Sequence, residues 1–264
     1  MKRIATSLVL IPLVIWAVLG APFWVFATVL AAVGLLAFHE FDQIAVAQGV
    51  AGAGWPGMAA GLALLFTNEQ FAPGPFLVIA IAALAAMALA LRLRDLTSAL
   101  SSAAVFLLGV IYVFGAWRCA MELRAINPHW LMIALLVSWA GDIAALYIGR
   151  AFGKHKLAPR VSPGKTWEGS AGSVAGGMLA AGIYAHYLIA EEPLGGVLAV
   201  AAAANIAGQM GDLCESAFKR GAGMKDSGTM LPGHGGWLDR IDSSLFSVPV
   251  VYAIRVLIMS HVHV

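Results

Sequence analysis

The polar chemistry of this chain is concentrated in one segment, residues 216–242, which lies between long apolar stretches. Basic side chains alternate there with carboxylates and glycines, around a Pro-Gly-His-Gly-Gly turn. Lysine and arginine supply charge for phosphates, and glycine lets backbone N–H groups approach a ligand closely. A merely basic loop would not need the interleaved acids. We therefore interpret the segment as a phosphate-binding site, with the candidate side chains Lys219, Arg220, Lys225, Asp226, His234, Asp239, Arg240 and Asp242.

Four aspartates make a metal ion part of this interpretation. Asp239 and Asp242 are three residues apart at the cap and first turn of the predicted last helix, where they could share a face. Asp142 lies within an apolar stretch and Asp212 ends another, and ionisable residues at such depth usually face the bundle interior and serve function. A helix cap or an interhelical hydrogen bond is the alternative for each. Paired carboxylates beside phosphate-binding bases are what Mg²⁺-assisted phosphoryl or nucleotidyl transfer requires.

A second polar segment, residues 150–169, has a similar composition. Its Ser-Pro-Gly-Lys-Thr run resembles half of a Walker A motif, but the upstream glycine and the preceding strand are missing, so we reject a P-loop. A basic, hydroxyl-bearing loop remains, suited to a triphosphate or a lipid phosphate. Anchoring to anionic lipids alone would explain Lys154, Lys156 and Arg160. It would explain the Lys-Thr-x-Glu-Gly cluster that follows less well. The candidate residues here are Ser162, Lys165, Thr166 and Glu168.

The elements that must position these residues are membrane helices. Of 264 residues, 61% are hydrophobic and 11% are charged, whereas soluble domains average about 45–50% and about 25%. Small residues four apart, such as Gly57 with Gly61 and Gly172 with Gly176, suit close helix packing. The sequence predicts an all-α, polytopic membrane helix bundle, with its first apolar run a retained helix. About nine transmembrane helices are expected, near 4–20, 22–38, 51–67, 76–91, 100–117, 130–149, 170–190, 195–212 and 243–260.

The distribution of basic residues orients these helices. With the N-terminus inside, 13 of the 16 Lys and Arg residues fall in cytoplasmic segments, Arg118 and Arg124 fall outside, and Arg255 lies in the last helix. Both polar segments then face the cytoplasm. We expect a single integral membrane domain, residues 1–264, in which 1–128 is mainly structural and 129–264 is the catalytic half.

The polar spacing resembles the signature of phosphatidate cytidylyltransferases, also called CDP-diacylglycerol synthases. The match is dense between about 142 and 242 and rests on hydropathy alone before that. Trp237 departs from it, since the family more often has an aliphatic residue there. The positions that carry the resemblance are Gly141-Asp142, Gly149-Arg150, Gly153-Lys154, Ser162-Pro163, Lys165-Thr166, Glu168-Gly169, Ser216, Lys219-Arg220, Lys225-Asp226, Leu231-Pro232, His234-Gly235-Gly236, Asp239-Arg240 and Asp242.

The resemblance implies that CTP and phosphatidic acid give CDP-diacylglycerol and pyrophosphate, with Mg²⁺ required. Asp212 and Asp239 are the first choice as metal ligands, followed by Asp242 and Asp142. His234 either stabilises the leaving group or only shapes the turn. The remaining catalytic candidates are Lys165, Lys219, Arg220, Lys225, Asp226 and Arg240, and the substrate-binding candidates are Ser162, Thr166, Glu168, Ser216, Gly235 and Gly236.

The expected surroundings are a bacterial plasma (inner) membrane and its lipids. A net charge of +2 does not favour nucleic acid as a partner. A homodimer and a monovalent cation beside Mg²⁺ are both left open.

Three alternative functions remain. CDP-alcohol phosphotransferases carry a run of aspartates at helical spacing, which this sequence lacks. An ion-coupled transporter using Asp142 and Asp212 would be expected to show an internal repeat and a polar path through the membrane. A lipid anchor predicts that replacing Asp239 by Asn is harmless.

Overall fold

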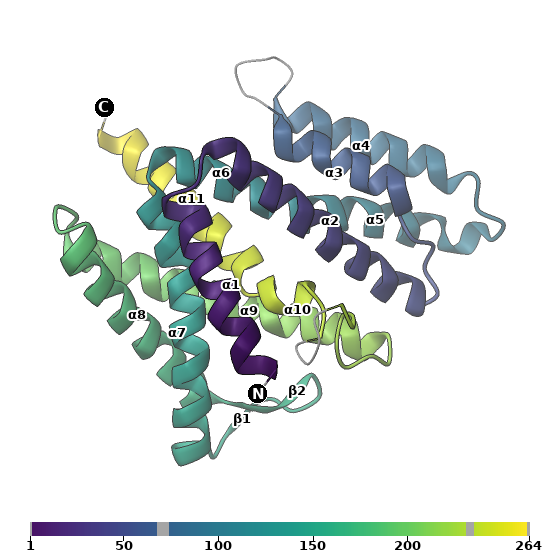
Figure 1. Ribbon diagram of the computed structural model, residues 1–264. Coiled ribbons are helices and arrows are strands. Elements are labelled where there is room, and N and C mark those ends of the chain that lie inside the picture. The colour runs from purple at the N-terminus through teal and green to yellow at the C-terminus, as the bar shows by residue number, and fades with distance from the viewer. Residues whose placement is uncertain (1, 68–73, 231–234, 263–264) are drawn as a thin grey trace. The chain divides into compact units, whose positions relative to one another are not determined.

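The computed structural model describes residues 2–67, 74–230 and 235–262, and most of them are helical (Figure 1). The elements are α1 (Lys2–Leu19), α2 (Phe23–Ala47), α3 (Gly54–Phe66), α4 (Pro75–Ala90), the 3₁₀ turn η1 (Leu96–Ser98), α5 (Ala99–Gly109), the π-helical turn η2 (Val110–Gly115), α6 (Ala116–Ile126), α7 (Pro128–Phe152), β1 (Lys156–Ala158), β2 (Ser162–Thr166), α8 (Trp167–Leu188), α9 (Leu194–Gly221), α10 (Leu238–Ile241) and α11 (Ser244–Val262).

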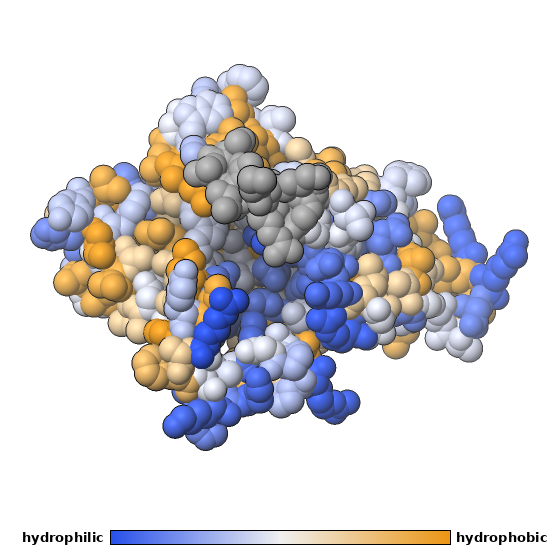
Figure 2. Space-filling model, turned by 60° about the horizontal axis from the view of Figure 1, so that its bottom comes forward, coloured by the Kyte–Doolittle hydropathy of each residue, from blue (hydrophilic) through white to orange (hydrophobic). Residues whose placement is uncertain are grey.

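The apolar helices confirm the all-α membrane class. Within the described ranges, five helical stretches are long and apolar enough to cross a membrane, and α3, α4 and residues 10–19 of α1 are shorter apolar helices. Large apolar side chains such as Phe76 and Leu100 are more than four-fifths exposed, which suits contact with lipid. Figure 2 shows such orange residues at the surface beside blue hydrophilic ones. The number of spans stays a prediction. The five stretches are Phe23–Ala47, Leu96–Ile126, Pro128–Phe152, Leu194–Gly221 and Leu238–Met259.

The predicted end of a helix at residue 212 is wrong. Helix α9 continues to Gly221, because no proline or glycine interrupts residues 212–220. Lys219 and Arg220 lie in its last turn, where positive charge favours the helix dipole. The helix ends just before Gly223, which has a positive φ of 69°. Ser216, Lys219 and Arg220 are therefore helical residues rather than loop residues.

Contacts divide the chain into two compact units, each built from separated segments. Unit 1 comprises Met1–Leu8, Pro22–Arg118 and Phe218–Arg240, and unit 2 comprises Val9–Ala21, Cys119–Ala217 and Ile241–Val264. The polar segment at 150–169 lies within unit 2, whereas the segment 216–242 is divided between the units. The single-domain organisation stays a prediction.

Unit 1 is built on α2, α3, α4 and α5, with α3 packed against α2, α4 and η2. Two glycines on α3 lie against aromatic rings of neighbouring helical elements. A Cβ on Gly57 would overlap the ring of Phe38, and a Cβ on Gly61 would overlap the ring of Phe114. The predicted close packing at this glycine pair is confirmed.

Unit 2 is organised around α7 and α8, which lie side by side and are joined by the antiparallel β1–β2 hairpin (Figure 1). Gly172 and Gly176 of α8 contact Ile148 and Ala144 of α7, so the second predicted glycine pair also packs closely. The hairpin was not predicted. Its strands pair Lys156 with Thr166, and this pairing holds the second polar segment in one conformation.

Candidate active site

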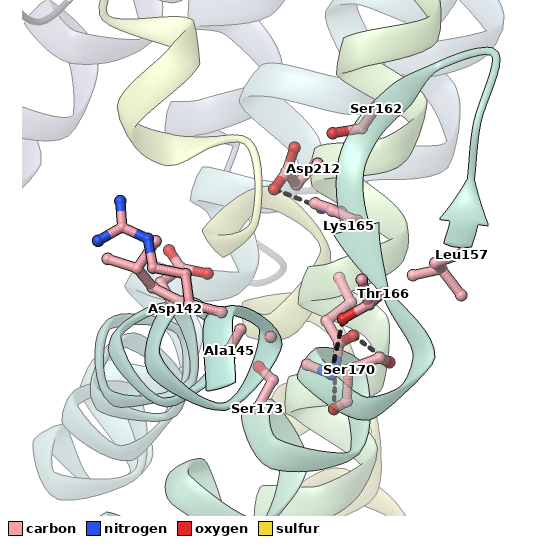
Figure 3. Close-up of a pocket in the computed structure, with 15 residues that line it drawn as sticks. Asp142, Ala145, Leu157, Ser162, Lys165, Thr166, Ser170, Ser173 and Asp212 are labelled. Atoms are coloured by element: carbon pink, nitrogen blue, oxygen red, sulfur yellow. Dashed lines mark hydrogen bonds and ion pairs between the residues drawn. The ribbon is translucent and has the colours of Figure 1, made fainter. Parts of the chain in front are cut away.

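A cavity of about 440 Å³ lies in unit 2 between α7, β2, α8 and α9 (Figure 3). Two of its lining side chains form an ion pair: Lys165 Nζ lies 2.6 Å from Asp212 Oδ2, and the side chains are 27% and 30% exposed. An ion pair with this much exposure to solvent can exchange one partner for a bound anion or cation. The structure thus brings together predicted residues of the second polar segment with the two aspartates predicted within and at the end of apolar stretches, which are Ser162, Lys165, Thr166, Asp142 and Asp212.

The hairpin places Lys165 immediately before a helix. Thr166 is the N-cap of α8, and its Oγ1 accepts a hydrogen bond from Gly169 N (3.1 Å). The Thr166 side chain is buried and also lines the cavity. A hydroxyl that caps a helix in this way fixes the backbone beside Lys165. Substrate binding by Thr166 stays a prediction.

Asp212 is oriented by its own helix. Ser216 Oγ donates to Asp212 Oδ1 (3.3 Å), one turn further along α9. One turn earlier, Gln209 contacts α8, since Ser170 Oγ donates to Gln209 Oε1 (2.5 Å). Gln209 Nε2 in turn donates to Asn205 Oδ1 (2.7 Å). These contacts fix the rotation of α9 about its axis and so the direction of the Asp212 side chain.

The sequence interpretation missed Asn205, Gln209 and Ser170. A detectable signal was present, because residues 205, 209 and 212 are spaced four and three apart on one face of an apolar helix. Polar residues repeating at that spacing indicate a polar stripe facing other helices.

The other two aspartates of unit 2 lie on different elements. Asp142 reaches the cavity from α7. Asp242 lies in the turn between α10 and α11, so the expectation that Asp239 and Asp242 share a face of the last helix is wrong. Gly211 lies against the carbonyl oxygen of Asp242, where a Cβ would be only 2.6 Å away. The glycine thus lets this turn approach α9 beside Asp212.

Glu168 supports the hairpin. Its carboxylate accepts hydrogen bonds from Lys154 N (3.1 Å) and His155 N (3.2 Å), and Oε1 lies 2.6 Å from His155 Nδ1. Its own backbone N–H, followed by the His155 side chain, lowers the Glu168 pKa to about 2. These partners belong to the start of the hairpin. A contact between Glu168 and substrate stays a prediction.

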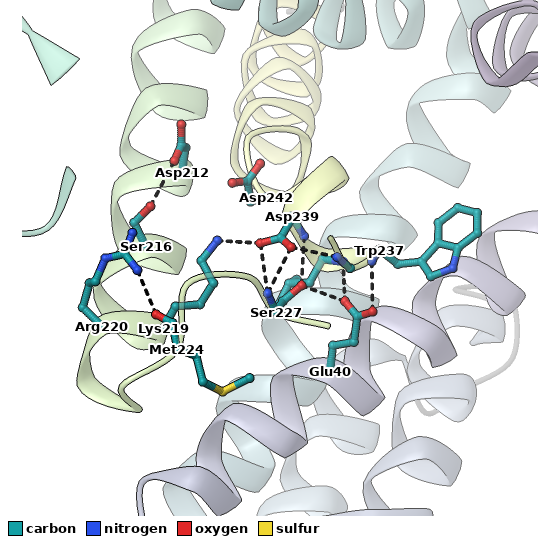
Figure 4. A network of polar contacts seen from close by, with 12 residues as sticks. Glu40, Asp212, Ser216, Lys219, Arg220, Met224, Ser227, Trp237, Asp239 and Asp242 are labelled. Carbon is teal, nitrogen blue, oxygen red and sulfur yellow. Dashed lines mark hydrogen bonds and ion pairs between the residues drawn. The ribbon is translucent and has the colours of Figure 1, made fainter. Parts of the chain in front are cut away.

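Unit 1 contains a second ion pair, which is buried (Figure 4). Lys219 Nζ lies 2.5 Å from Asp239 Oδ1, and the side chains are 9% and 6% exposed. Asp239 also accepts from Ser227 N (3.0 Å) and Gly236 N (2.8 Å). Both carboxylate oxygens thus bind protein donors, and the charge facing Asp239 is the Lys219 ammonium. Metal binding by Asp239 stays a prediction.

Steric constraints explain why glycine occupies two positions of the predicted turn. Gly235 has a φ of 80°, and a Cβ there would also crowd Asp239 Oδ2. Gly236 is buried, and a Cβ there would overlap Glu40 Oε2 and Ser227 Oγ. Their observed role is to let the backbone wrap closely around carboxylates. His234 lies outside the described residues.

The remaining predicted residues lie at the end of α9 and after it. Arg220 Nη1 donates to Met224 O (2.8 Å) and so closes the end of the helix. Lys225, Asp226 and Arg240 are exposed, which leaves their side chains accessible to a ligand.

The oxygen donors of the unit 2 cavity fit Mg²⁺. Asp212 and Asp142 provide carboxylates, and the same lining includes serine and threonine hydroxyls. Mg²⁺ prefers oxygen ligands and is usually held by one or two carboxylates together with substrate phosphates. Across the described part of the chain, no group of three or more His, Cys, Asp or Glu side chains could hold a metal by itself. A metal site here would therefore depend on the substrate's phosphates as ligands.

Sequence comparisons bear on what such a site does. The chain matches the model of the cytidylyltransferase family over residues 1–258. A phosphatidate cytidylyltransferase of Haemophilus influenzae is 41% identical over 146 residues, 52% of this chain and 51% of that relative. One from Bacillus subtilis is 39% identical over 150 residues, 55% of each chain. These matches span about half of the relatives' length. A third, from Staphylococcus aureus (strain COL), is 32% identical over 237 residues, 88% of this chain and 89% of that relative.

The match over 258 residues includes both polar segments and the helices that carry them. The spacing of the polar residues had predicted this result. The chain belongs to the cytidylyltransferase family.

Proposed function

We propose that this membrane protein transfers the cytidylyl group of CTP to phosphatidic acid, giving CDP-diacylglycerol and pyrophosphate. The observation that carries the proposal is the partly exposed Lys165–Asp212 pair in a hydroxyl-lined cavity of a membrane protein of this family. A cation and carboxylates in one cavity suit a nucleoside triphosphate and its Mg²⁺. The relatives' names supply the lipid substrate.

The reaction needs positioning and charge neutralisation more than acid–base chemistry. A phosphate oxygen of the lipid attacks the α-phosphorus of CTP, the bond to the β-phosphate breaks, and pyrophosphate leaves with the bonding electrons. The attacking phosphate monoester is already ionised near neutral pH, so no general base is required. Lys165 would neutralise charge on the triphosphate, and its release from Asp212 would accompany substrate binding.

Asp212, with Asp142, would hold Mg²⁺. When bound, the ion supplies neutralising charge and aligns phosphate oxygens. Ser216 and Gln209 would keep Asp212 directed into the cavity through the contacts described above. A monovalent cation and a homodimer stay predictions.

The active site would face the cytoplasm, because the basic residues of both polar segments lie on the side that the positive-inside rule assigns to it. CTP is made in that compartment. The surrounding bilayer would supply phosphatidic acid from the same leaflet.

The test follows each phosphorus atom of CTP. Purified protein in detergent, with phosphatidic acid and Mg²⁺, should move label from the α-phosphorus into an organic-soluble lipid and label from the γ-phosphorus into pyrophosphate. Chelating Mg²⁺ should abolish both. Label from the γ-phosphorus in the lipid would indicate a kinase instead, and no labelled lipid at all would overturn the proposal.

A further inference from the structure

A carboxylate from the N-terminal half holds the turn that carries Asp239. Glu40 on α2 is 3% exposed. Its Oε2 accepts from Ser227 Oγ (2.8 Å) and Leu238 N (2.8 Å), and its Oε1 accepts from Trp237 N (3.0 Å) (Figure 4). A buried carboxylate is costly unless donors compensate it, and here three donors from one turn do so.

Ser227 links Glu40 to the buried ion pair. Its hydroxyl donates to Glu40 and accepts from Asp239 N (3.3 Å), while its own N–H donates to both oxygens of Asp239. Asp239 then holds the Lys219 ammonium at 2.5 Å. The contacts form a continuous chain from α2 to the last turn of α9.

The backbone around Glu40 leaves room for this carboxylate. A Cβ on Gly228 would lie 2.5 Å from Glu40 Oε1, and one on Gly236 would overlap Glu40 Oε2. Close contact on both sides means that the turn is shaped to this side chain. An acid needed only to balance charge would not require such a fit.

We propose that Glu40 is a positioning residue for the reaction. It holds the turn formed by residues 227–230 and 235–238 so that Asp239 and Lys219, which the family resemblance implies take part in the reaction, keep one mutual geometry. It does so without touching substrate. The inference rests on the proposed cytidylyl transfer. Residues 1–128 were expected to be mainly structural, and the inference assigns one of them a role in activity.

A neighbouring carboxylate on the same helix provides the matched control. Asp42 is also buried, at 7% exposure, but it accepts hydrogen bonds from Ala53 N (2.5 Å) and Gly54 N (3.2 Å) at the start of α3. Asp42→Asn and Glu40→Gln remove the same charge from the same helix. Only the second acts on the turn.

The experiment compares these two variants and Ser227→Ala with the wild type, per folded protein. Glu40→Gln should lower kcat by about 10–100-fold, because small misplacements of catalytic groups are costly, while KM for both substrates changes much less. Ser227→Ala should lower kcat less. The double variant should lose less than the product of the two single losses, since Glu40 and Ser227 share one contact. Asp42→Asn should keep the wild-type kcat.

Amide hydrogen exchange provides a readout that does not depend on activity. Glu40→Gln should speed exchange in peptides that carry the Ser227, Trp237 and Leu238 amides, and Asp42→Asn should speed it at Ala53 and Gly54 instead. Unchanged exchange at the turn, or a kcat loss shared equally by Asp42→Asn, would overturn the inference. If Glu40→Gln does not fold, Ser227→Ala decides by the same criteria. An inactive wild type would refute the proposed function, and the exchange pattern would still decide whether Glu40 holds the turn.

Discussion

Lys165 is the residue whose charge the proposed reaction uses most directly. Because its pair with Asp212 is partly exposed, a triphosphate can take the place of Asp212. We predict that Lys165→Met lowers kcat/KM by about 10²–10³-fold, the usual cost of losing one transition-state donor, with little change in stability. Steady-state kinetics on purified protein measures this.

The matched control is Lys156→Met, which removes an exposed base from the same hairpin. It should retain activity within about twofold. Equal losses in the two variants would instead favour a general role of positive charge in binding anionic lipid.

Gly236 tests the close packing around Glu40. Gly236→Ala should destabilise the protein by about 1–3 kcal/mol, because the added methyl overlaps Glu40 Oε2 and Ser227 Oγ. Activity per folded protein should fall as well. Gly196→Ala is the control, since no atom lies within 4 Å of the added Cβ. It should be neutral or stabilise α9 by up to about 1 kcal/mol. Thermal unfolding in detergent distinguishes the two.

At the scale of elements, the stability that the β1–β2 hairpin contributes should depend on the ionisation of Glu168. Its own amide and His155 lower the Glu168 pKa from 4.5 to about 2. A lowered folded-state pKa adds stability that is fully present above pH 4.5 and is lost as pH falls through about 2.

The measurement compares wild type with Glu168→Gln across this range. The difference in their unfolding temperatures should be constant above about pH 5 and should shrink below it. A difference that does not vary with pH between 4.5 and 2 would contradict the prediction.

In unit 2, Arg255 of α11 forms an ion pair with Glu192, which lies between α8 and α9, and its guanidinium packs on Trp130 of α7. Arg255 Nη2 lies 3.0 Å from Glu192 Oε1, and the guanidinium lies 4.4 Å from the centre of the Trp130 ring. We predict that Arg255→Met destabilises the protein by about 2 kcal/mol, because it leaves a mostly buried carboxylate without its strongest donor.

Activity per folded molecule should stay unchanged in Arg255→Met. Trp130 and Asp142 are 12 residues apart on α7, which corresponds to about 18 Å along the helix axis. Unfolding and kinetic measurements on the same sample check this. A kcat loss without destabilisation would contradict it.

At the scale of the whole molecule, the distribution of charge predicts the orientation in the membrane. After both native cysteines are replaced by alanine, a cysteine at Lys225 should react with a membrane-impermeant thiol reagent only from the cytoplasmic side. A cysteine at Glu191 should react only from the outside. Reaction of the Lys225 position from outside would refute the cytoplasmic active site and leave the enzymatic proposal standing.

Most of the fold class could be predicted from the sequence, and less of the site. Hydropathy located every long helix, because the need to bury backbone groups in lipid acts on each segment separately. It misplaced the end at Asp212, since a helix can continue past the apolar stretch when no residue breaks it. The hairpin at 156–166 was missed because two short strands have too little periodicity to detect.

The sequence by itself determined the membrane class, the family and the set of polar residues, because these depend on composition and on spacing along the chain. Only the tertiary structure decided which residues meet. It paired Asp212 with Lys165 and Asp239 with Lys219, and it brought Glu40 to Ser227 across 187 positions. The physical reason is that contacts between distant segments depend on how the helices pack. Spacing along one sequence does not specify that packing, so it does not specify which carboxylate faces which donor.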